Sequence, residues 1–271
     1  MGDQNLNSEQ IAALNELRTS FPLDRDSNGL PLDDSCLMRY LRARNWNVSK
    51  AGKMLSATLD WRRNFGVEKV LNEEGDVIAR ENSTGKIYLR GYDKAGRPIM
   101  IMRPRCENTK NHDGNIKHLV YQMERARTIL QDEGGGKGKM CLAIDFGGYS
   151  MFNATPMKTS KETLNILQNH YPETLGVAYM LSPPLLFKGF WNVIYPFIDP
   201  TTKEKFMFVS GSLTTPTAQE ALAKNFILDS MEESLGGKNK VPFDSATYLK
   251  SQMNEEYEAA LASSSPPAAN S

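Results

Sequence analysis

The sequence predicts an α/β fold in which helices cover a mixed or largely parallel sheet, with a small helical region in front of it. Between residues 86 and 210, five short apolar runs alternate with helical patterns, the order expected for a sheet with helices on its faces. Before residue 75, apolar residues recur at helical spacing. We therefore expect a helical region over 1–75, a sheet-containing region over 76–250, and a helical end with a disordered tail over 251–271.

Each element has its own signal. Leu37, Tyr40 and Leu41 share one helical face after the cap cluster at 33–35, and a second helix follows Ser49. Strands are expected at 86–92, 97–102, 139–146, 175–181 and 205–210. Helices between them are expected at 115–130 and from Thr155, which stands before a proline in the first helical turn.

Composition narrows the function classes. Lys plus Arg equals Asp plus Glu at 32 each, so no basic field favours nucleic acid as a partner. Cys36, Cys106 and Cys141 are few and widely spaced, which indicates free thiols in a reducing compartment. The polar first residues lack a signal-peptide pattern. We predict a cytoplasmic monomer.

Sequence motifs give no support for an enzyme. Asp145-Phe146-Gly147 spells a kinase tripeptide, but no catalytic loop precedes it. The glycine- and lysine-rich stretch at 133–139 precedes a strand instead of a helix, so it is no Walker loop. The three histidines are isolated and the cysteines unpaired. We therefore predict neither a catalytic residue, nor a metal site, nor a cofactor.

The most informative segment is 174–198, whose single charged residue is Lys188. Prolines and glycine interrupt it, so it is not a simple membrane span. Its second part, 185–197, is predicted to be a helix with apolar residues over an arc of roughly 200°, wider than one core contact uses. Such a helix is either buried on nearly all sides, or it meets an apolar ligand on one side and a membrane on the other. The arc contains Leu186, Phe187, Phe190, Trp191, Val193, Ile194, Tyr195 and Phe197.

Several segments together resemble the CRAL-TRIO lipid-binding family, in particular its phosphatidylinositol transfer proteins. They read LMRYLRARNWNVSKAGKML, DWRRNFG, DKAGRPI, AIDFGG, the long block from NHYPETLG to KFMFVSG, and SLGG. The resemblance spans about residues 37–237. It implies a helical N-terminal domain and an α/β domain that encloses one phospholipid in an apolar pocket.

The resemblance also implies how cargo enters and how it is held. The helix at 185–197 would be a mobile gate that Asp199 and Pro200 terminate. Exposing about thirty lipid methylenes to water would cost on the order of 24 kcal/mol, so the gate would open against a membrane, with which the protein associates transiently. The expected headgroup ligands are Arg44 and Thr202 for the phosphate, and Glu173 paired with Lys205 for the inositol.

Alternatives stay open at this point. Arg44 can instead tie the two regions together, Thr202 can cap a turn, and Glu173 with Lys205 can be a structural ion pair. Met140 and Leu142 stand where relatives that also carry phosphatidylcholine have hydroxyl residues. Rival functions are a carrier of a sterol, an isoprenoid or haem, for which His170 or Tyr171 would be ligands, and a scaffold that exchanges no lipid. Asn45, where a second basic residue often stands, weakens the expected phosphate contacts.

Overall fold

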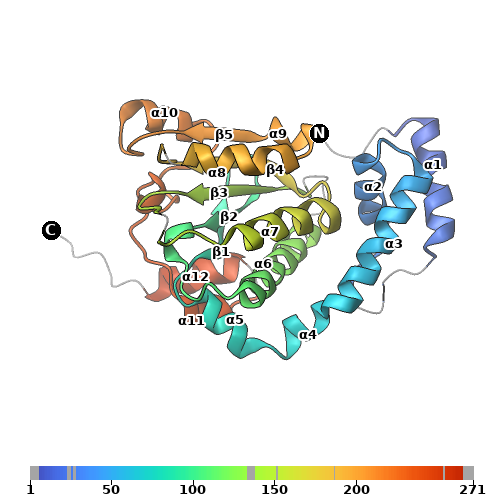
Figure 1. The fold of residues 1–271 in the computed structure, drawn as a ribbon, viewed down its shortest axis with the longest axis horizontal. Coiled ribbons are helices and arrows are strands. Elements are labelled where there is room, and N and C mark those ends of the chain that lie inside the picture. The colour runs from blue at the N-terminus through green and yellow to red at the C-terminus, as the bar shows by residue number, and fades with distance from the viewer. Residues whose placement is uncertain are drawn as a thin grey trace.

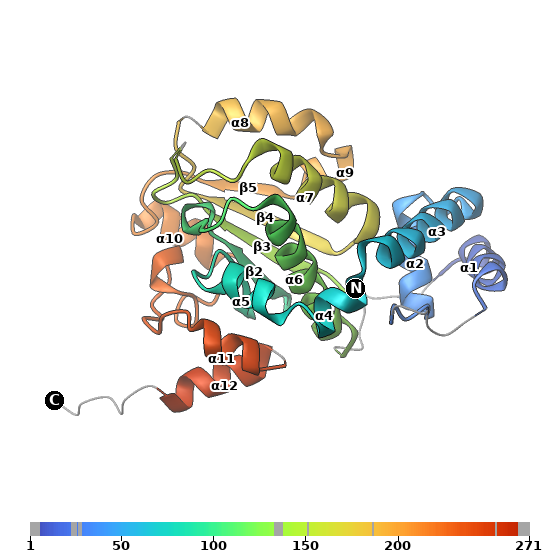
Figure 2. The ribbon, with the colours of Figure 1, turned by 60° about the horizontal axis from the view of Figure 1, so that its bottom comes forward.

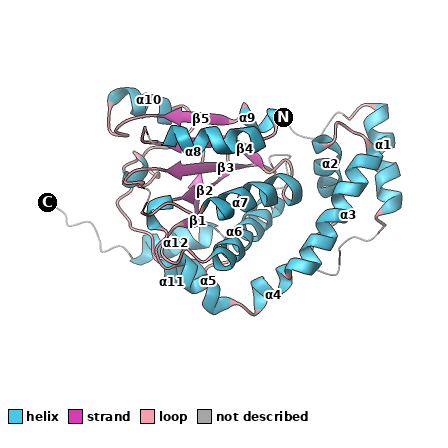
Figure 3. Cartoon of the chain, in the orientation of Figure 1, coloured by secondary structure: helices cyan, strands magenta, loops and turns pink. Residues whose placement is uncertain are grey.

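A five-stranded sheet forms the centre of the computed structural model, which describes residues 6–22, 26, 29–132, 138–150, 152–185, 187–252 and 254–264. Helices lie on both faces of the sheet, and a further group of helices stands to one side (Figures 1 and 3). The strands occur where the sequence predicts them, and their spatial order equals their chain order. They are β1 (Ile87–Tyr92), β2 (Pro98–Met102), β3 (Met140–Asp145), β4 (Leu175–Leu181) and β5 (Phe206–Val209).

The sheet is mixed, as predicted. β1 and β2 form an antiparallel hairpin, whereas β2, β3, β4 and β5 are parallel. The hairpin turn is held by Asp93, whose Oδ1 accepts hydrogen bonds from the backbone N–H groups of Ala95 and Arg97. Gly96 supplies the positive φ of 73° that this turn requires.

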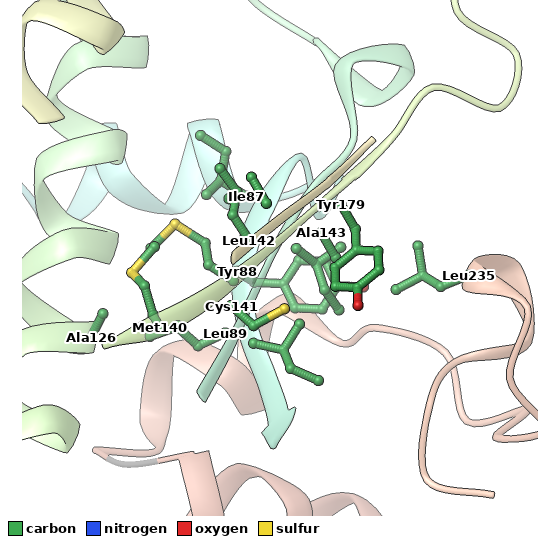
Figure 4. Packing of buried hydrophobic residues seen from close by; sticks show 14 of the residues in the cluster. Ile87, Tyr88, Leu89, Ala126, Met140, Cys141, Leu142, Ala143, Tyr179 and Leu235 are labelled. Atoms are coloured by element: carbon green, nitrogen blue, oxygen red, sulfur yellow. The ribbon is translucent and has the colours of Figure 1, made fainter. Parts of the chain in front are cut away.

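Two sets of helices cover the two faces of the sheet (Figure 2). On one face lie α6 (His112–Asp132), α7 (Met157–His170) and α8 (Phe187–Ile194). The C-terminal elements lie on the other face, where Tyr179 packs edge-to-face on Phe226 with ring centroids 4.7 Å apart. Figure 4 shows the alternation along the strands: Met140 points towards Ala126 of α6, whereas Tyr179 points towards Leu235. The other helices after residue 74 are α5 (Gly75–Asn82), α9 (Pro200–Lys203), α10 (Pro216–Ala223), α11 (Ser245–Lys250) and α12 (Asn254–Ser264). Short 3₁₀ turns lie at Pro104–Cys106 and Glu233–Leu235.

The N-terminal helices have an apolar cluster of their own. It includes the fully buried Leu37, Leu41 and Leu55. Asp33 caps the second helix, as predicted. The third helix begins slightly earlier than expected, before Ser49. Its cap is Asn47, whose side chain accepts from the backbone N–H of Lys50 at 2.9 Å. These helices are α1 (Ser8–Ser20), α2 (Asp34–Ala43), α3 (Val48–Phe65) and α4 (Val67–Asn72).

Two other sequence predictions need comment. Thr155 does not cap α7: Pro156 occupies the cap position without a side-chain hydrogen bond, and Thr155 lines a cavity. The loop at 133–137 and the tail at 265–271 fall outside the described residues. Among the helices that are described, none is both long enough and apolar enough to cross a bilayer.

Candidate functional site

A cavity of about 950 Å³ lies on the face of the sheet that carries α6, α7 and α8. This volume is at the upper end of the roughly 300–1,000 Å³ typical of ligand pockets. Its walls are mainly apolar, since alternate residues of β2 and β3 face it. Wall residues include Met100, Met102, Leu119, Met123, Met140, Leu142, Ile144, Leu164, Leu167 and Met180.

The segment predicted to act as a gate, 185–197, lies beside this cavity and contains α8. Phe187 is buried against Phe146, with ring centroids 4.4 Å apart, and Trp191 packs edge-to-face on Phe206 at 5.0 Å. Of the predicted gate residues, Phe190, Trp191, Ile194 and Phe197 line the cavity, Phe187 packs beneath the helix, and Tyr195 is exposed. Leu186 falls outside the described residues.

The outer side of the gate is apolar as well. Val193, Tyr195 and Phe197 are 44%, 43% and 55% exposed, and Met207 and Phe208 of the edge strand β5 are similarly exposed. A contiguous exposed apolar surface marks an interaction site in a folded protein. The helix therefore presents apolar side chains to both the cavity and the exterior, and the interpretation of a helix buried on all sides is wrong.

The gate ends earlier than predicted. α8 stops at Ile194 and continues as a 3₁₀ turn over Tyr195–Phe197, because Pro196 has no N–H to extend the helical ladder. Asp199 does not terminate the gate. It caps the next helix, α9, by accepting from the backbone N–H of Thr202 at 2.9 Å.

Gln168 of α7 fastens this end of the gate. Its side-chain Nε2 donates to the carbonyl of Phe197 at 2.9 Å, and its Oε1 accepts from the N–H of Asp199 at 2.8 Å. Two lysines lie against the exposed rings nearby: Lys203 Nζ is 4.5 Å from the ring centre of Tyr195, and Lys161 Nζ is 5.0 Å from that of Phe197. The segment after α8 is thus held by side chains that sequence patterns do not reveal.

The four predicted headgroup residues all line the same cavity. Arg44 ends α2, and Lys205 stands directly before β5, where its carbonyl accepts from the N–H of Ala178. Thr202 belongs to α9, and Glu173 lies two residues before Leu175, the first residue of β4. Elements far apart in the sequence therefore bring two cations, a carboxylate and a hydroxyl to one end of the cavity.

The predicted pair of Glu173 and Lys205 is not present. Among the described residues Glu173 pairs with Lys139, at 3.3 Å from Nζ to Oε2. The reason is register: Met140 of β3 lies opposite Leu175 of β4, which places the residues just before each strand side by side. Glu173 also has a positive φ of 59°, a conformation that non-glycine residues adopt at a cost and that is concentrated at functional sites.

A buried ionic cluster supports the segment before Glu173. Arg62 of α3 and Glu124 of α6 form a two-pronged pair at 2.6 and 3.1 Å, with each side chain only 2% exposed. Arg127 also donates to Glu124, at 2.9 Å, and the hydroxyl of Tyr171 donates to it at 2.9 Å. Burial acts to raise the pKa of Glu124, but hydrogen bonding to Arg62 and the charge of Arg127 outweigh it and lower the pKa.

His170 and Tyr171, the candidate ligands under the rival haem hypothesis, make other contacts here. His170 stacks on Trp61 at 4.1 Å, and its Nδ1 lies 3.2 Å from the hydroxyl of Thr58. Tyr171 is engaged with Glu124. Burial lowers the pKa of His170 to about 4. Within the described part of the chain, no group of three or more His, Cys, Asp or Glu residues could hold a metal ion, and the three cysteines are free.

Sequence reasoning missed several residues at the mouth. Arg42 and Lys203 line the cavity together with Arg44 and Lys205. Arg42 lies two residues before Arg44 in the LRAR segment, and Lys203 follows Thr202. Their closeness in sequence to predicted headgroup residues could have identified them. Lys139 and Gln168 gave no such signal, because their partners lie 34 and 29 residues away. Met140 and Leu142 do face the cavity, as predicted.

An apolar cavity with a charged mouth, beside a helix that is apolar on both sides, has the chemistry that an amphipathic, lipid-like ligand requires. Comparison with protein families agrees: the CRAL/TRIO domain matches residues 82–237, more than half of the chain, and the CRAL/TRIO N-terminal domain matches residues 13–57. The chain belongs to the CRAL/TRIO family.

Individual relatives point the same way. A CRAL-TRIO domain-containing protein of Schizosaccharomyces pombe is 42% identical over 72% of this chain, and the phosphatidylinositol transfer protein PDR17 of Saccharomyces cerevisiae is 35% identical over 67% of it. The chain spans only 19% and 56% of their lengths. The SEC14 cytosolic factor of Eremothecium gossypii is 30% identical, over 88% of this chain and 79% of its own length. The crystal structure of Sfh5 has the same fold, with a TM-score of 0.71 at 18% identity over 96% of this chain and 98% of that one.

Proposed function

We propose that this protein binds one phosphatidylinositol molecule and transfers it between membranes or presents it at one, as a cytoplasmic monomer without a catalytic step. The carrying observation is that Arg44, Glu173, Thr202 and Lys205 line one cavity whose remaining walls are largely apolar. A phosphodiester needs cations and an inositol ring needs acceptors for its hydroxyl groups. Both chemistries lie at the same end of the cavity.

Exchange requires the gate to move. Extracting acyl chains through water is too costly by the estimate of about 0.8 kcal/mol per methylene, so opening would occur against a bilayer. The exposed rings of Tyr195 and Phe197 can enter a membrane interface and replace protein contacts by lipid contacts. Lys139 would release Glu173 to Lys205 or to the inositol when the headgroup enters.

The test is mass spectrometry of lipids that copurify with the full chain from a eukaryotic host without detergent. Wild type should carry about one phosphatidylinositol per protein, and the double variant Arg44→Ala, Lys205→Ala should carry at least tenfold less, since hydrogen bonds to charged groups contribute about 1.5–3 kcal/mol each. The matched control is Arg63→Ala, Lys250→Ala, which removes the same number of charges from exposed residues outside the cavity.

Three results would contradict the proposal: wild type carries no phosphatidylinositol, the cavity double variant carries as much phosphatidylinositol as wild type, or the control variant loses as much of it as the cavity variant does. Transfer between vesicles is then measured with the same proteins. A protein that loads lipid without exchanging it would be a scaffold or a store rather than a transfer protein.

A further inference from the structure

Glu173 stands between two lysines that come from the two neighbouring strands of the sheet. β4 lies between β3 and β5, Lys139 directly precedes β3, and Lys205 directly precedes β5. The pairing of β4 with both neighbours places Lys205 level with Cys141, which is two residues, or about 7 Å, further along β3 than Lys139. Lys205 lines the cavity, whereas Lys139 lies outside its lining.

The carboxylate of Glu173 is paired with the outer of these two lysines. Lys139 Nζ lies 3.3 Å from Glu173 Oε2, and the side chains of the lysine and the glutamate are 43% and 22% exposed. Oε1 of Glu173 has no hydrogen bond to a residue that the structure describes, and Lys205 forms no ion pair with any of these residues. The cation inside the cavity is thus without a carboxylate, because the carboxylate is held by a cation outside it.

The backbone of the two strands fixes this arrangement. The N–H of Met140 donates to the carbonyl of Thr174 at 2.7 Å. The pairing register shifts directly after Met140, so that Gly176 is an additional residue in β4 at this point. A Cβ atom at Gly176 would lie 2.9 Å from atoms of the Arg97 side chain and 3.2 Å from the carbonyl oxygen of Met140, so a larger residue would push the strands apart. The amino ends of β3 and β4 are therefore held together, and their two charged side chains stay within reach of each other.

The ion pair competes with the chemistry that an inositol ring requires. Two neighbouring hydroxyl groups of a ring can donate to the two oxygens of one carboxylate. Pairing with Lys139 engages Oε2 and draws the carboxylate of Glu173 towards the exterior. Full contact with the ring therefore requires that this ion pair break.

We infer that Lys139 is a positioning residue that competes with the inositol headgroup for Glu173, and thereby lowers the affinity for the lipid and speeds its release. This inference rests on the proposed function. In the unloaded protein Glu173 pairs with Lys139; in the loaded protein it turns towards Lys205 and accepts hydrogen bonds from the ring. When the lipid leaves, Lys139 captures the carboxylate again and stabilises the unloaded state. A transfer protein has to release its cargo at the acceptor membrane, so a built-in competitor favours delivery over storage.

The test compares Lys139→Met with wild type in the full chain, with pyrene-labelled phosphatidylinositol in phosphatidylcholine vesicles as the probe. Partly exposed ion pairs shift an equilibrium by up to about fivefold, so the variant should bind the probe about two- to fivefold more tightly and release it correspondingly more slowly. Lys139→Arg, which can form the same ion pair, should behave as wild type does. The matched control is Lys53→Met, which removes the same charge from an exposed residue outside the cavity and should change neither quantity.

A second comparison shows whether Lys139 acts through Glu173. In the background of Glu173→Gln, the change Lys139→Met should have no further effect on affinity, because the ion pair is already absent. The ratio of the affinities of Lys139→Met and wild type should also approach one at about 1 M salt, where the Debye length is about 3 Å. If Glu173→Gln binds the probe too weakly for measurement, the salt dependence decides this point.

Three results would overturn the inference and leave the proposed cargo intact: Lys139→Met binds the probe no more tightly than wild type, Lys53→Met gains as much affinity, or the gain persists at high salt and without the carboxylate. A wild-type protein that binds no phosphatidylinositol would refute the proposed function and this inference with it. Binding by wild type therefore distinguishes the two failures.

Discussion

Replacing Glu124 by Gln should destabilise the protein by about 3–5 kcal/mol, the usual cost of breaking a buried ion pair from one side. The change keeps the shape of the side chain and removes its charge. Arg62, which is 2% exposed, and Arg127, which is 13% exposed, would then face a neutral amide. Both guanidinium groups would lose the negative charge of Glu124, in a place where little water can replace it.

The magnitude translates into a measurable shift. For a chain of 271 residues, 1 kcal/mol corresponds to roughly 2 °C in the midpoint of thermal unfolding, so Glu124→Gln should unfold about 6–10 °C below wild type. The matched control is Asp60→Asn, which breaks the neighbouring pair with Arg63, whose side chains are 62% and 64% exposed. Exposed pairs contribute about 0–1 kcal/mol, so the control should shift by about 2 °C or less.

Thermal unfolding followed by circular dichroism gives both midpoints under one buffer condition. Equal small shifts in Glu124→Gln and Asp60→Asn would refute the reasoning, because they would show that the buried cluster contributes no more than a surface pair. A large shift in both would refute it as well, since the effect would then not depend on burial.

Two further predictions concern the gate and pH. Gln168→Ala removes two hydrogen bonds, worth about 0.5–1.5 kcal/mol each, and should speed lipid transfer between vesicles by roughly five- to 150-fold. Asn165→Ala, on the same helix but outside the cavity, should leave the rate unchanged. A slower or equal rate for Gln168→Ala would show that Gln168 does not restrain the gate. His170 has its pKa lowered to about 4 by burial, below its ordinary value of about 6.5, so its contribution to stability is full above about pH 6.5 and is lost as the pH falls towards 4. The unfolding midpoint of wild type should therefore drop more between about pH 7 and about pH 5 than that of His170→Asn, and parallel losses in the two proteins would show that His170 is not responsible.

Local sequence pattern was sufficient for the sheet and for the position of the gate. The alternation of short apolar runs with helical segments predicts the five strands, because each strand must be buried and each connection must cross a face. The excess apolar surface of 185–197 predicts a helix with apolar side chains on two sides, and α8 has them: Trp191 lines the cavity, whereas Val193 is 44% exposed. These features depend on neighbouring residues, which the sequence displays directly.

Features that depend on pairing between distant residues could not be predicted. Lys139 meets Glu173 only because β3 and β4 pair in one register, and Gln168 reaches the end of the gate only because α7 lies beside it. The early end of α8 was predictable in principle, since Pro196 is visible in the sequence. The wide apolar arc obscured it, because the residues after the proline continue the same chemistry in a 3₁₀ turn.

The conformation of Glu173 connects the headgroup end of the cavity to the interior of the protein. Its left-handed backbone, which costs on the order of 1 kcal/mol or more, is held from both sides: Tyr171 is fixed by Glu124, and the carbonyl of Thr174 accepts from the N–H of Met140 at 2.7 Å. Arg62 brings the N-terminal helices into the same cluster. The carboxylate proposed to meet the inositol is therefore placed by contacts between the N-terminal helices, α6 and the sheet. A substitution at the boundary between these parts should therefore weaken binding of the headgroup more than it changes the packing of the apolar cavity walls.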